Sequence, residues 1–203
     1  MRLPTLLLAA LCALPLACKP AGASGFNPDG LAGPRIDPPL PKPDFALPAT
    51  DGKPFDFRKE TEGYVTLLFF GYTHCPDVCP VQMANVSAAL STLSPEINNA
   101  VKVVFVTTDP ERDTPPVLRA WLNKFDPQFI GLIGDSATVA RTSHALHMPP
   151  PEREALPDGS GYGIGHAAFV VAFTRDNLAH VVYPFGIRQA DWARDLKILT
   201  RAP

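Results

Sequence analysis

Two cysteines stand close together in the motif GYTHCPDVCP at residues 71–80, where three residues separate Cys75 from Cys79. If this segment formed one turn of helix, the i and i+4 positions would place both sulfur atoms on one face. Two thiols on one face can close a disulfide or bind one soft metal ion. The other cysteines, Cys12 and Cys18, lie in the N-terminal leader. Cys75 and Cys79 are therefore each other's only intrachain partners in the expected folded part.

The spacing of the pair and its local structure favour metal binding. Thioredoxin-type oxidoreductases separate their cysteines by two residues, and the additional residue here widens the ring that a disulfide must close. It also allows the two sulfur atoms to lie on either side of a bound metal ion. The N-terminus of an expected helix lies directly behind the motif and favours thiolate over thiol. Thiolates select soft ions, above all Cu(I), but two sulfur ligands leave a site incomplete.

His166 is the best candidate for a third ligand, because it follows the glycine-rich segment 160–165 and opens an expected strand at 167–173. A lone histidine at a strand edge is more often structural, but this edge faces the cysteine loop in the expected layout. For the remaining candidates we expect His74 to point away from the site, His144 and His147 to share a helix face at the surface, His180 to be exposed, Met83 to lie in the core, and Met148 to be either a core residue or a ligand.

The elements that must position these residues alternate between β and α segments. In chain order we expect a small N-terminal hairpin at 44–57, a strand at 64–70, a helix at 81–93, a strand at 101–107, a helix at 116–125, a short strand at 129–133, a helix at 135–147, a loop at 148–163, a hairpin of 167–173 with 178–183, and a helix at 191–199. This order predicts an α/β, thioredoxin-like fold with a central mixed sheet flanked by helices. The cysteines then lie at the first βα turn, where ligand chemistry is expected.

The composition of the chain limits its class. Its 203 residues are 46% hydrophobic and 19% charged, and its formal net charge is −2. These values are typical of one globular domain with a sizeable core. The charge gives no electrostatic footprint for nucleic acid, so we expect no nucleic-acid partner.

Residues 1–18 have the character of an export signal, in which a positively charged start precedes the apolar run 3–14. This run is too short to span a bilayer comfortably. The sequence LPLAC at 14–18 is similar to a bacterial lipobox, in which the cysteine is lipidated. We therefore expect Cys18 to anchor the protein to a membrane on the extracytoplasmic side. Ordinary signal cleavage after residues 21–23 is the alternative.

Residues 19–43 are small, polar and rich in proline. Such a segment cannot bury enough apolar surface to fold, so we expect an extended, semi-stiff spacer. A flexible tail with no role is the alternative. The thioredoxin-like domain is then expected to cover residues 44–203.

Three separated motifs resemble those of the Sco/SenC family. They are GYTHCPDVCP at 71–80, DPERDTP at 109–115, and His166 before an apolar strand, and the resemblance covers roughly residues 45–199 in the same order. Three motifs in one order make a specific match. The family consists of thioredoxin-fold copper proteins that assist assembly of the dinuclear copper centre of cytochrome c oxidase.

The resemblance implies a copper site made by Cys75, Cys79 and His166, which would bind Cu(I), with Cu(II) as a further candidate. Members of the family often carry an acidic residue just before the histidine, where this chain has Gly165. A group that orients the imidazole would therefore have to come from elsewhere.

The loop at 109–115 has two interpretations that we weigh evenly. It is either a rigid turn that caps a helix, or a segment that brings Asp109 and Arg112 near the thiols. In the second case Arg112 would stabilise a thiolate and Asp109 would shape a docking face.

The resemblance predicts a monomeric, membrane-anchored copper chaperone. Its partners would be the copper-bearing subunit of cytochrome c oxidase and a thiol reductant. The main alternative is an enzyme, a thiol–disulfide oxidoreductase in which Cys75 and Cys79 are the redox-active pair that reduces the cysteines of the copper-accepting subunit. A thiol peroxidase is a third option, which needs one low-pKa cysteine set against a base. The sequence leaves open whether the protein is an enzyme as well as a chaperone.

Overall fold

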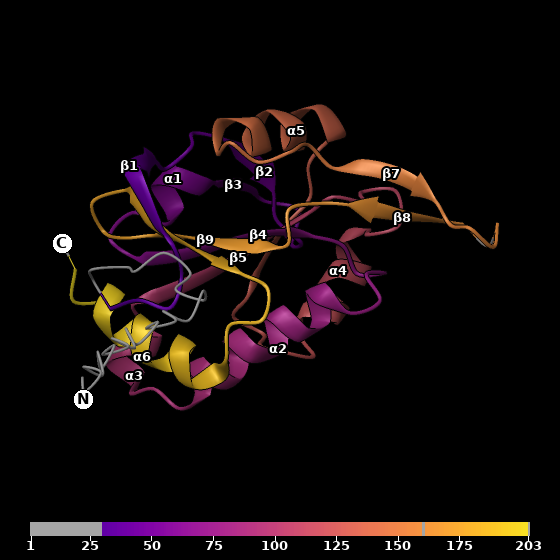
Figure 1. The fold of residues 1–203 in the computed structure, drawn as a ribbon. Coiled ribbons are helices and arrows are strands. Elements are labelled where there is room, and N and C mark those ends of the chain that lie inside the picture. Colours follow the sequence, from indigo (N-terminus) through magenta and orange to yellow (C-terminus); the bar gives the residue numbers. More distant parts are fainter. Residues whose placement is uncertain (1–29, 160, 203) are drawn as a thin grey trace, which may run out of the picture.

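The computed structural model describes residues 30–159 and 161–202. Its centre is a six-stranded mixed sheet with helices on both faces (Figure 1). In spatial order the strands are β1 (Arg35–Pro41), β10 (Leu178–Pro184), β9 (Phe169–Phe173), β4 (Val65–Gly71), β5 (Val101–Thr107) and β6 (Ile130–Leu132). β4, β5 and β6 run parallel, whereas β9 pairs antiparallel with β4 and with β10, which pairs antiparallel with β1. The expected α/β fold with a mixed central sheet is confirmed.

β4 and β5 lie in the middle of the sheet, and their sequences explain this position. All seven residues of β4 are buried, as are the last five of β5. A continuous apolar run suits a parallel strand that is covered on both faces. Successive side chains point to opposite faces, so Leu67 and Phe69 join one hydrophobic cluster while Leu68 and Phe70 join the other.

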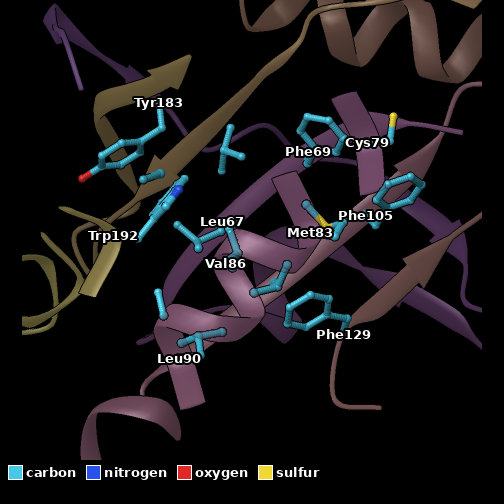
Figure 2. Close-up of a cluster of buried hydrophobic side chains, with 14 of the residues drawn as sticks. Leu67, Phe69, Cys79, Met83, Val86, Leu90, Phe105, Phe129, Tyr183 and Trp192 are labelled. Atoms are coloured by element: carbon cyan, nitrogen blue, oxygen red, sulfur yellow. The ribbon is translucent and has the colours of Figure 1, made fainter. Parts of the chain in front are cut away.

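The helices form one layer on each side of the sheet. They are α1 (Phe57–Glu60), α2 (Val78–Ser91), α3 (Pro95–Asn98), α4 (Pro115–Leu122), α5 (Ser136–Ala145) and α6 (Gln189–Leu199). Figure 2 shows the cluster on one face, in which Met83 and Val86 of α2 and Trp192 of α6 are grouped with Leu67 of β4. On the other face, α1 and α5 contribute Phe57 and Val139. Within the described part of the chain, no helix is both long enough and apolar enough to cross a membrane.

The predicted N-terminal hairpin is present as β2 (Ala46–Pro48) paired antiparallel with β3 (Pro54–Asp56). Its turn depends on the residues that the sequence supplies there. Gly52 has a φ of 82°, which suits glycine because it has no Cβ. The Asp51 side chain accepts a hydrogen bond from the Lys53 N–H at 3.1 Å. The second predicted hairpin is also present, as β9 paired with β10.

The start of the ordered domain differs from the prediction, because the spacer expected at residues 19–43 contains strand β1. The export signal expected at 1–18, and the spacer up to residue 29, lie outside the described residues. β1 contains three prolines, which remove backbone donors, and it lies at the edge of the sheet, where such donors are not all needed. Its register with β10 is irregular between Arg35 and Leu40. Proline content alone therefore gave the wrong boundary.

The loop expected at 148–163 is also corrected, because it contains most of a separate hairpin. β7 (Glu152–Ala155) pairs antiparallel with β8 (Tyr162–Gly165) in a two-stranded sheet of its own. All four residues of β7 are exposed, so the strand has no apolar side from which its period could be recognised. In Figure 1 this hairpin projects away from the central sheet.

Candidate metal centre

The cysteine motif forms the turn between β4 and α2, at the carboxyl end of β4. Cys75 lies in the loop and is half-buried, whereas Cys79 lies in the first turn of α2 and is buried; both are free cysteines. The helix begins at Val78, and the side chain of Asp77 accepts a hydrogen bond from the Val78 N–H. The two cysteines therefore do not share one helical turn. Instead, the Cys79 N–H lies 3.4 Å from Cys75 Sγ, so this sulfur lies at the positive end of the helix.

Cys79 is held at the edge of the hydrophobic cluster, beside Phe69 and Phe105 (Figure 2). The end of β4 is shaped to admit its sulfur atom. A Cβ added to Gly71 would lie 2.8 Å from Cys79 Sγ, 2.8 Å from Phe69 and 3.0 Å from Phe105. Only glycine fits such a contact without displacing the sulfur. Gly71 therefore allows the buried thiol to approach the carboxyl end of the strand.

His166 comes from a distant part of the chain, in the connection between β8 and β9. Its ring makes edge-to-face contacts with Phe69 and Tyr72, at centroid distances of 5.9 and 5.7 Å. His166 Nδ1 lies 3.1 Å from the backbone oxygen of Ala167. When Nδ1 carries the proton, it donates to this carbonyl and leaves the Nε2 lone pair free. A backbone carbonyl thus orients the imidazole, which answers the question raised by Gly165.

The three predicted ligands converge at one place. Cys79 Sγ lies 3.4 Å from His166 Nε2, and the ligand atoms of Cys75, Cys79 and His166 all lie within 4.8 Å of one another. Two sulfurs and one imidazole nitrogen at this separation suit a soft transition metal, because metal–ligand bonds of about 2.0–2.3 Å would span it. Among the residues that the structure describes, this is the one group of histidine, cysteine and carboxylate side chains with the geometry to hold a metal ion.

The two thiols have opposite acidities. A hydrogen bond from the Cys79 thiol is the main cause that lowers the pKa of Cys75 to about 4, and hydrogen bonds from backbone N–H groups act in the same direction. The hydrogen bond to Cys75, together with burial, raises the pKa of Cys79 above its ordinary value. At neutral pH the metal-free pair therefore carries one thiolate, on the sulfur of the half-buried Cys75, and one thiol, on the sulfur of the buried Cys79.

Comparison with known proteins decides the family. The family model described as SCO1/SenC matches residues 35–201. The chain belongs to the SCO1/SenC family. The resemblance found in its three motifs is thereby confirmed, and the matched region includes strand β1.

Two curated SCO relatives and one solved structure illustrate the similarity. "Protein SCO2, mitochondrial" of Saccharomyces cerevisiae is 32% identical over 127 residues, which cover 62% of this chain and 41% of that protein. An SCO2-like protein of Rickettsia felis is 33% identical over 130 residues, covering 62% of this chain and 60% of that protein. The structure of Bradyrhizobium japonicum ScoI with copper bound has a TM-score of 0.69 and 32% identity, covering 79% of this chain and 99% of that one. The chain thus spans less than two thirds of either curated relative.

The loop after β5, which carries the second SCO motif, lies beside the site, and its two aspartates, Asp109 and Asp113, are buried. Asp113 is 0% exposed, and its carboxylate accepts hydrogen bonds from the Thr73 N–H at 3.0 Å and from the hydroxyls of Thr73 and Thr107, both at 2.6 Å. Arg112 pairs with the carboxylate of Asp109 and donates to the Tyr162 carbonyl at 3.1 Å. The loop is therefore a turn that is hydrogen-bonded to the cysteine loop, but it gives α4 no side-chain cap. Arg112 is engaged with a carboxylate and a carbonyl oxygen.

The other histidines and methionines lie outside the group of three ligands. His74 is exposed, and its Nδ1 lies 3.1 Å from Thr73 Oγ1. His144 and His147 are at the surface as expected, but His147 lies beyond the end of α5 with a φ of 55°, so they do not share a helix face. His180, expected to be exposed, is partly exposed and pairs with Asp176 at 2.7 Å. Met83 and Met148 are both buried in the core.

Three residues that shape the site were not recognised from the sequence. They are Gly71, Asp113 and Tyr72, whose ring contacts His166. Gly71 and Tyr72 lie within the family motif, directly before the cysteines, so their position could have indicated that they contact the site. Nothing in the local sequence indicates that the carboxylate of Asp113 reaches back to Thr73.

Proposed function

We propose that Cys75, Cys79 and His166 bind one copper ion, and that the protein delivers it to the copper-bearing subunit of cytochrome c oxidase to assist assembly of the dinuclear copper centre. The observation that carries the proposal is the convergence of the three ligand atoms within 4.8 Å. Two thiolates and an imidazole suit Cu(I), with Cu(II) as a further candidate. The solved relative from Bradyrhizobium japonicum holds copper and is 32% identical, which supports the same cargo here.

Loading requires protons to leave the ligands. Cys75 is already a thiolate at neutral pH, because its pKa is about 4. The raised pKa of Cys79 keeps a proton on that sulfur, so copper binding must displace it, and binding weakens in acid. Oxidation of the pair to a disulfide would remove both sulfur ligands, so a thiol reductant is needed to keep the site competent.

Release would proceed from the accessible side of the site. Cys75 and His166 are partly exposed, whereas Cys79 is 0% exposed. Ligands of the acceptor subunit therefore reach the copper beside Cys75 and His166 and exchange with these residues first. Cys79 is the last ligand to leave, because the hydrophobic cluster shields it.

Copper titration of the reduced full chain in competition with a Cu(I) chelator tests the proposal. We expect one copper per chain, and none after oxidation to the disulfide. Loss of a group that only orients a metal ligand weakens binding by ~10–100-fold. We expect a larger loss when a ligand itself is removed, as in Cys75→Ala, Cys79→Ala or His166→Ala. His180→Ala is the control. An unchanged affinity in the His166→Ala protein would remove this histidine from the site, and absence of copper binding by the unaltered protein would end the proposal.

A thiol–disulfide reductase remains a second candidate, which the opposite acidities of the two thiols favour. The Cys75 thiolate would attack a target disulfide and release one target thiolate. Cys79, once deprotonated, would then attack the mixed disulfide and release the second, leaving Cys75–Cys79 oxidised. A Cys79→Ser protein that traps a mixed disulfide with the acceptor subunit would support this activity, and failure to trap one would count against it.

For the leader we propose an export signal at residues 1–18 and lipidation of Cys18, which would hold the domain at the extracytoplasmic face of a membrane. The sequence LPLAC supports this proposal. Incorporation of labelled palmitate that is lost in the Cys18→Ser protein is the expected result. We also propose that the protein is a monomer, for which sedimentation equilibrium is the test.

A further inference from the structure

The hairpin β7–β8 carries His166 at its root, because the histidine follows Gly165, the last residue of β8. This hairpin forms its own two-stranded sheet and does not join the six-stranded sheet. In Figure 1 it extends outward from the body of the molecule. Hydrogen bonds to the six-stranded sheet therefore do not fix its position. Ile164 of β8, buried in the hydrophobic cluster, holds the root, and other contacts hold the rest of the hairpin.

Tyr162 of β8 is the centre of the contacts that hold the hairpin. Its ring centroid lies 3.8 Å from the guanidinium carbon of Arg112 and 4.0 Å from that of Arg153. Its hydroxyl donates to Asp109 Oδ1 at 2.9 Å, and its carbonyl accepts from Arg112 Nη1 at 3.1 Å. A tyrosine ring with two guanidinium groups is held by cation–π attraction as well as by hydrogen bonds.

The two arginines are themselves anchored to the loop after β5. Arg112 pairs with Asp109, which is 1% exposed, and Arg153 of β7 pairs with Glu111 at 2.7 Å. Both strands of the hairpin are thus tied to the same loop. We call Asp109, Glu111, Arg112, Arg153 and Tyr162 the tyrosine clamp.

The same loop also fixes the cysteine side of the site. Asp113 directly follows Arg112 in this loop and is 0% exposed. Its carboxylate accepts hydrogen bonds from the Thr73 N–H and hydroxyl. Thr73 lies two residues before Cys75. One short loop therefore positions both the sulfur ligands and the hairpin that carries the imidazole.

We infer that the tyrosine clamp sets the distance between His166 and the two sulfur atoms, with Tyr162 as a positioning residue. The inference rests on the proposed copper site, because copper is the ion that the three ligands would hold. When the clamp is intact, the hairpin root keeps the ring against Phe69 and Tyr72. When Tyr162 is lost, the root is no longer fixed, the imidazole is held less closely to the sulfurs, and the three-ligand site binds copper more weakly.

The first test measures Cu(I) affinity of the reduced full chain carrying Tyr162→Leu. We expect a loss of ~10–100-fold, the range for a group that orients a metal ligand. Tyr162→Phe keeps the ring and loses only the bond to Asp109, so its loss should be smaller. Tyr64→Leu is the matched control, because Tyr64 also contacts a cation, with Lys102 Nζ 4.1 Å from its ring, but it directly precedes β4, at the end of this strand remote from the cysteines. Equal affinities of the Tyr162→Leu and unaltered proteins would overturn the inference.

A second readout needs no metal and so separates this inference from the copper proposal. The ring protons of His166 should show ring-current shifts from Phe69 and Tyr72, which NMR detects in the metal-free protein. In Tyr162→Leu these shifts should collapse towards free-histidine values, while the thermal midpoint stays close to that of Tyr64→Leu. Unchanged shifts would disprove the clamp even if copper binds. If the unaltered protein binds no copper, the copper proposal fails, and the shifts alone still decide the role of Tyr162.

Discussion

The two thiols of the site differ in exposure and in hydrogen bonding, and this difference predicts their reactivity. The Cys79 thiol is the main donor that lowers the pKa of Cys75 to about 4. Alkylation of Cys75 in the metal-free full chain should therefore rise near pH 4 and stay almost flat through neutral pH, because only the thiolate reacts. In Cys79→Ala the donor is lost, so the pKa of Cys75 rises and the reaction curve moves to higher pH.

Rates of iodoacetamide labelling across the pH range, followed by mass spectrometry of the peptide that contains Cys75, measure this effect. His180→Ala provides the control curve, since His180 pairs with Asp176 on another part of the surface. A Cys75 rate that still climbs steeply between about pH 7 and 9, as for an ordinary thiol, would contradict the prediction.

At the same scale, the sequence predicted the three residues that the structure brings together, but not the residues that hold them in place. Cys75 and Cys79 were recognisable because their spacing is itself a chemical pattern. His166 was recognisable from its place after a glycine-rich segment and from the family resemblance. Asp113 contacts Thr73, and Tyr162 contacts Asp109. In each pair the two residues are 40 or more positions apart in the sequence. No local pattern encodes such contacts, so they became visible only in the folded chain.

At the scale of elements, prediction succeeded where apolar residues set a clear period. β4 and β5 are continuous apolar runs, and α2 is present, although it runs over Val78–Ser91 and so begins three residues before the expected start at 81. It failed for the exposed hairpin β7–β8 and for the proline-containing β1, whose positions depend on pairing and not on an apolar face.

Strand β1 leads directly into a buried lysine, which the prediction of a spacer did not anticipate. Lys42 is 1% exposed, and its Nζ donates to the Thr61 carbonyl and hydroxyl oxygens, both at 3.1 Å. The rings of Phe57 and Phe173 lie 5.9 and 5.8 Å from Nζ. Burial, with the nearby charge of Arg58, lowers the pKa of Lys42 to about 8.

This lowered pKa makes the free energy of unfolding depend on pH. Between about pH 8 and the ordinary value of 10.5, the unfolded chain holds a proton on Lys42 that the folded chain has released, so stability rises with pH. The rise should reach up to ~3 kcal/mol, at ~1.4 kcal/mol per unit of pKa, and Lys42→Met should lack it. Urea unfolding of the reduced proteins from pH 7 to pH 10.5 measures the difference. Lys53→Met, at a side chain 82% exposed, is the control, and parallel pH curves for the unaltered and Lys42→Met proteins would refute the effect.

At the scale of the whole molecule, the N-terminal segment closes the sheet. β1 pairs with β10 and so covers an edge whose backbone groups would otherwise be open. Just before it, the Ala32 N–H donates to Asp195 of α6 at 2.7 Å, and this carboxylate is 0% exposed. The segment before residue 44 is therefore joined to the sheet and to the last helix, so it belongs to the domain and is more than a tether.

The boundary at residue 44, which the sequence alone predicts, can be tested directly. A chain of residues 44–203 lacks β1 and Lys42, so it exposes the backbone of β10 and leaves Asp195 without the Ala32 N–H. We expect the loss of these contacts to lower the free energy of unfolding by several kcal/mol. At ~2–4 °C per kcal/mol, the thermal midpoint should fall by about 10 °C or more. The shortened chain should also tend to associate through the open edge of the sheet. A chain of residues 30–203 keeps every one of these contacts and should melt with the full chain in calorimetry. Equal midpoints for the 44–203 and 30–203 chains would show that β1 adds nothing to the domain, and the ordered domain would then begin where the proline-rich sequence ends.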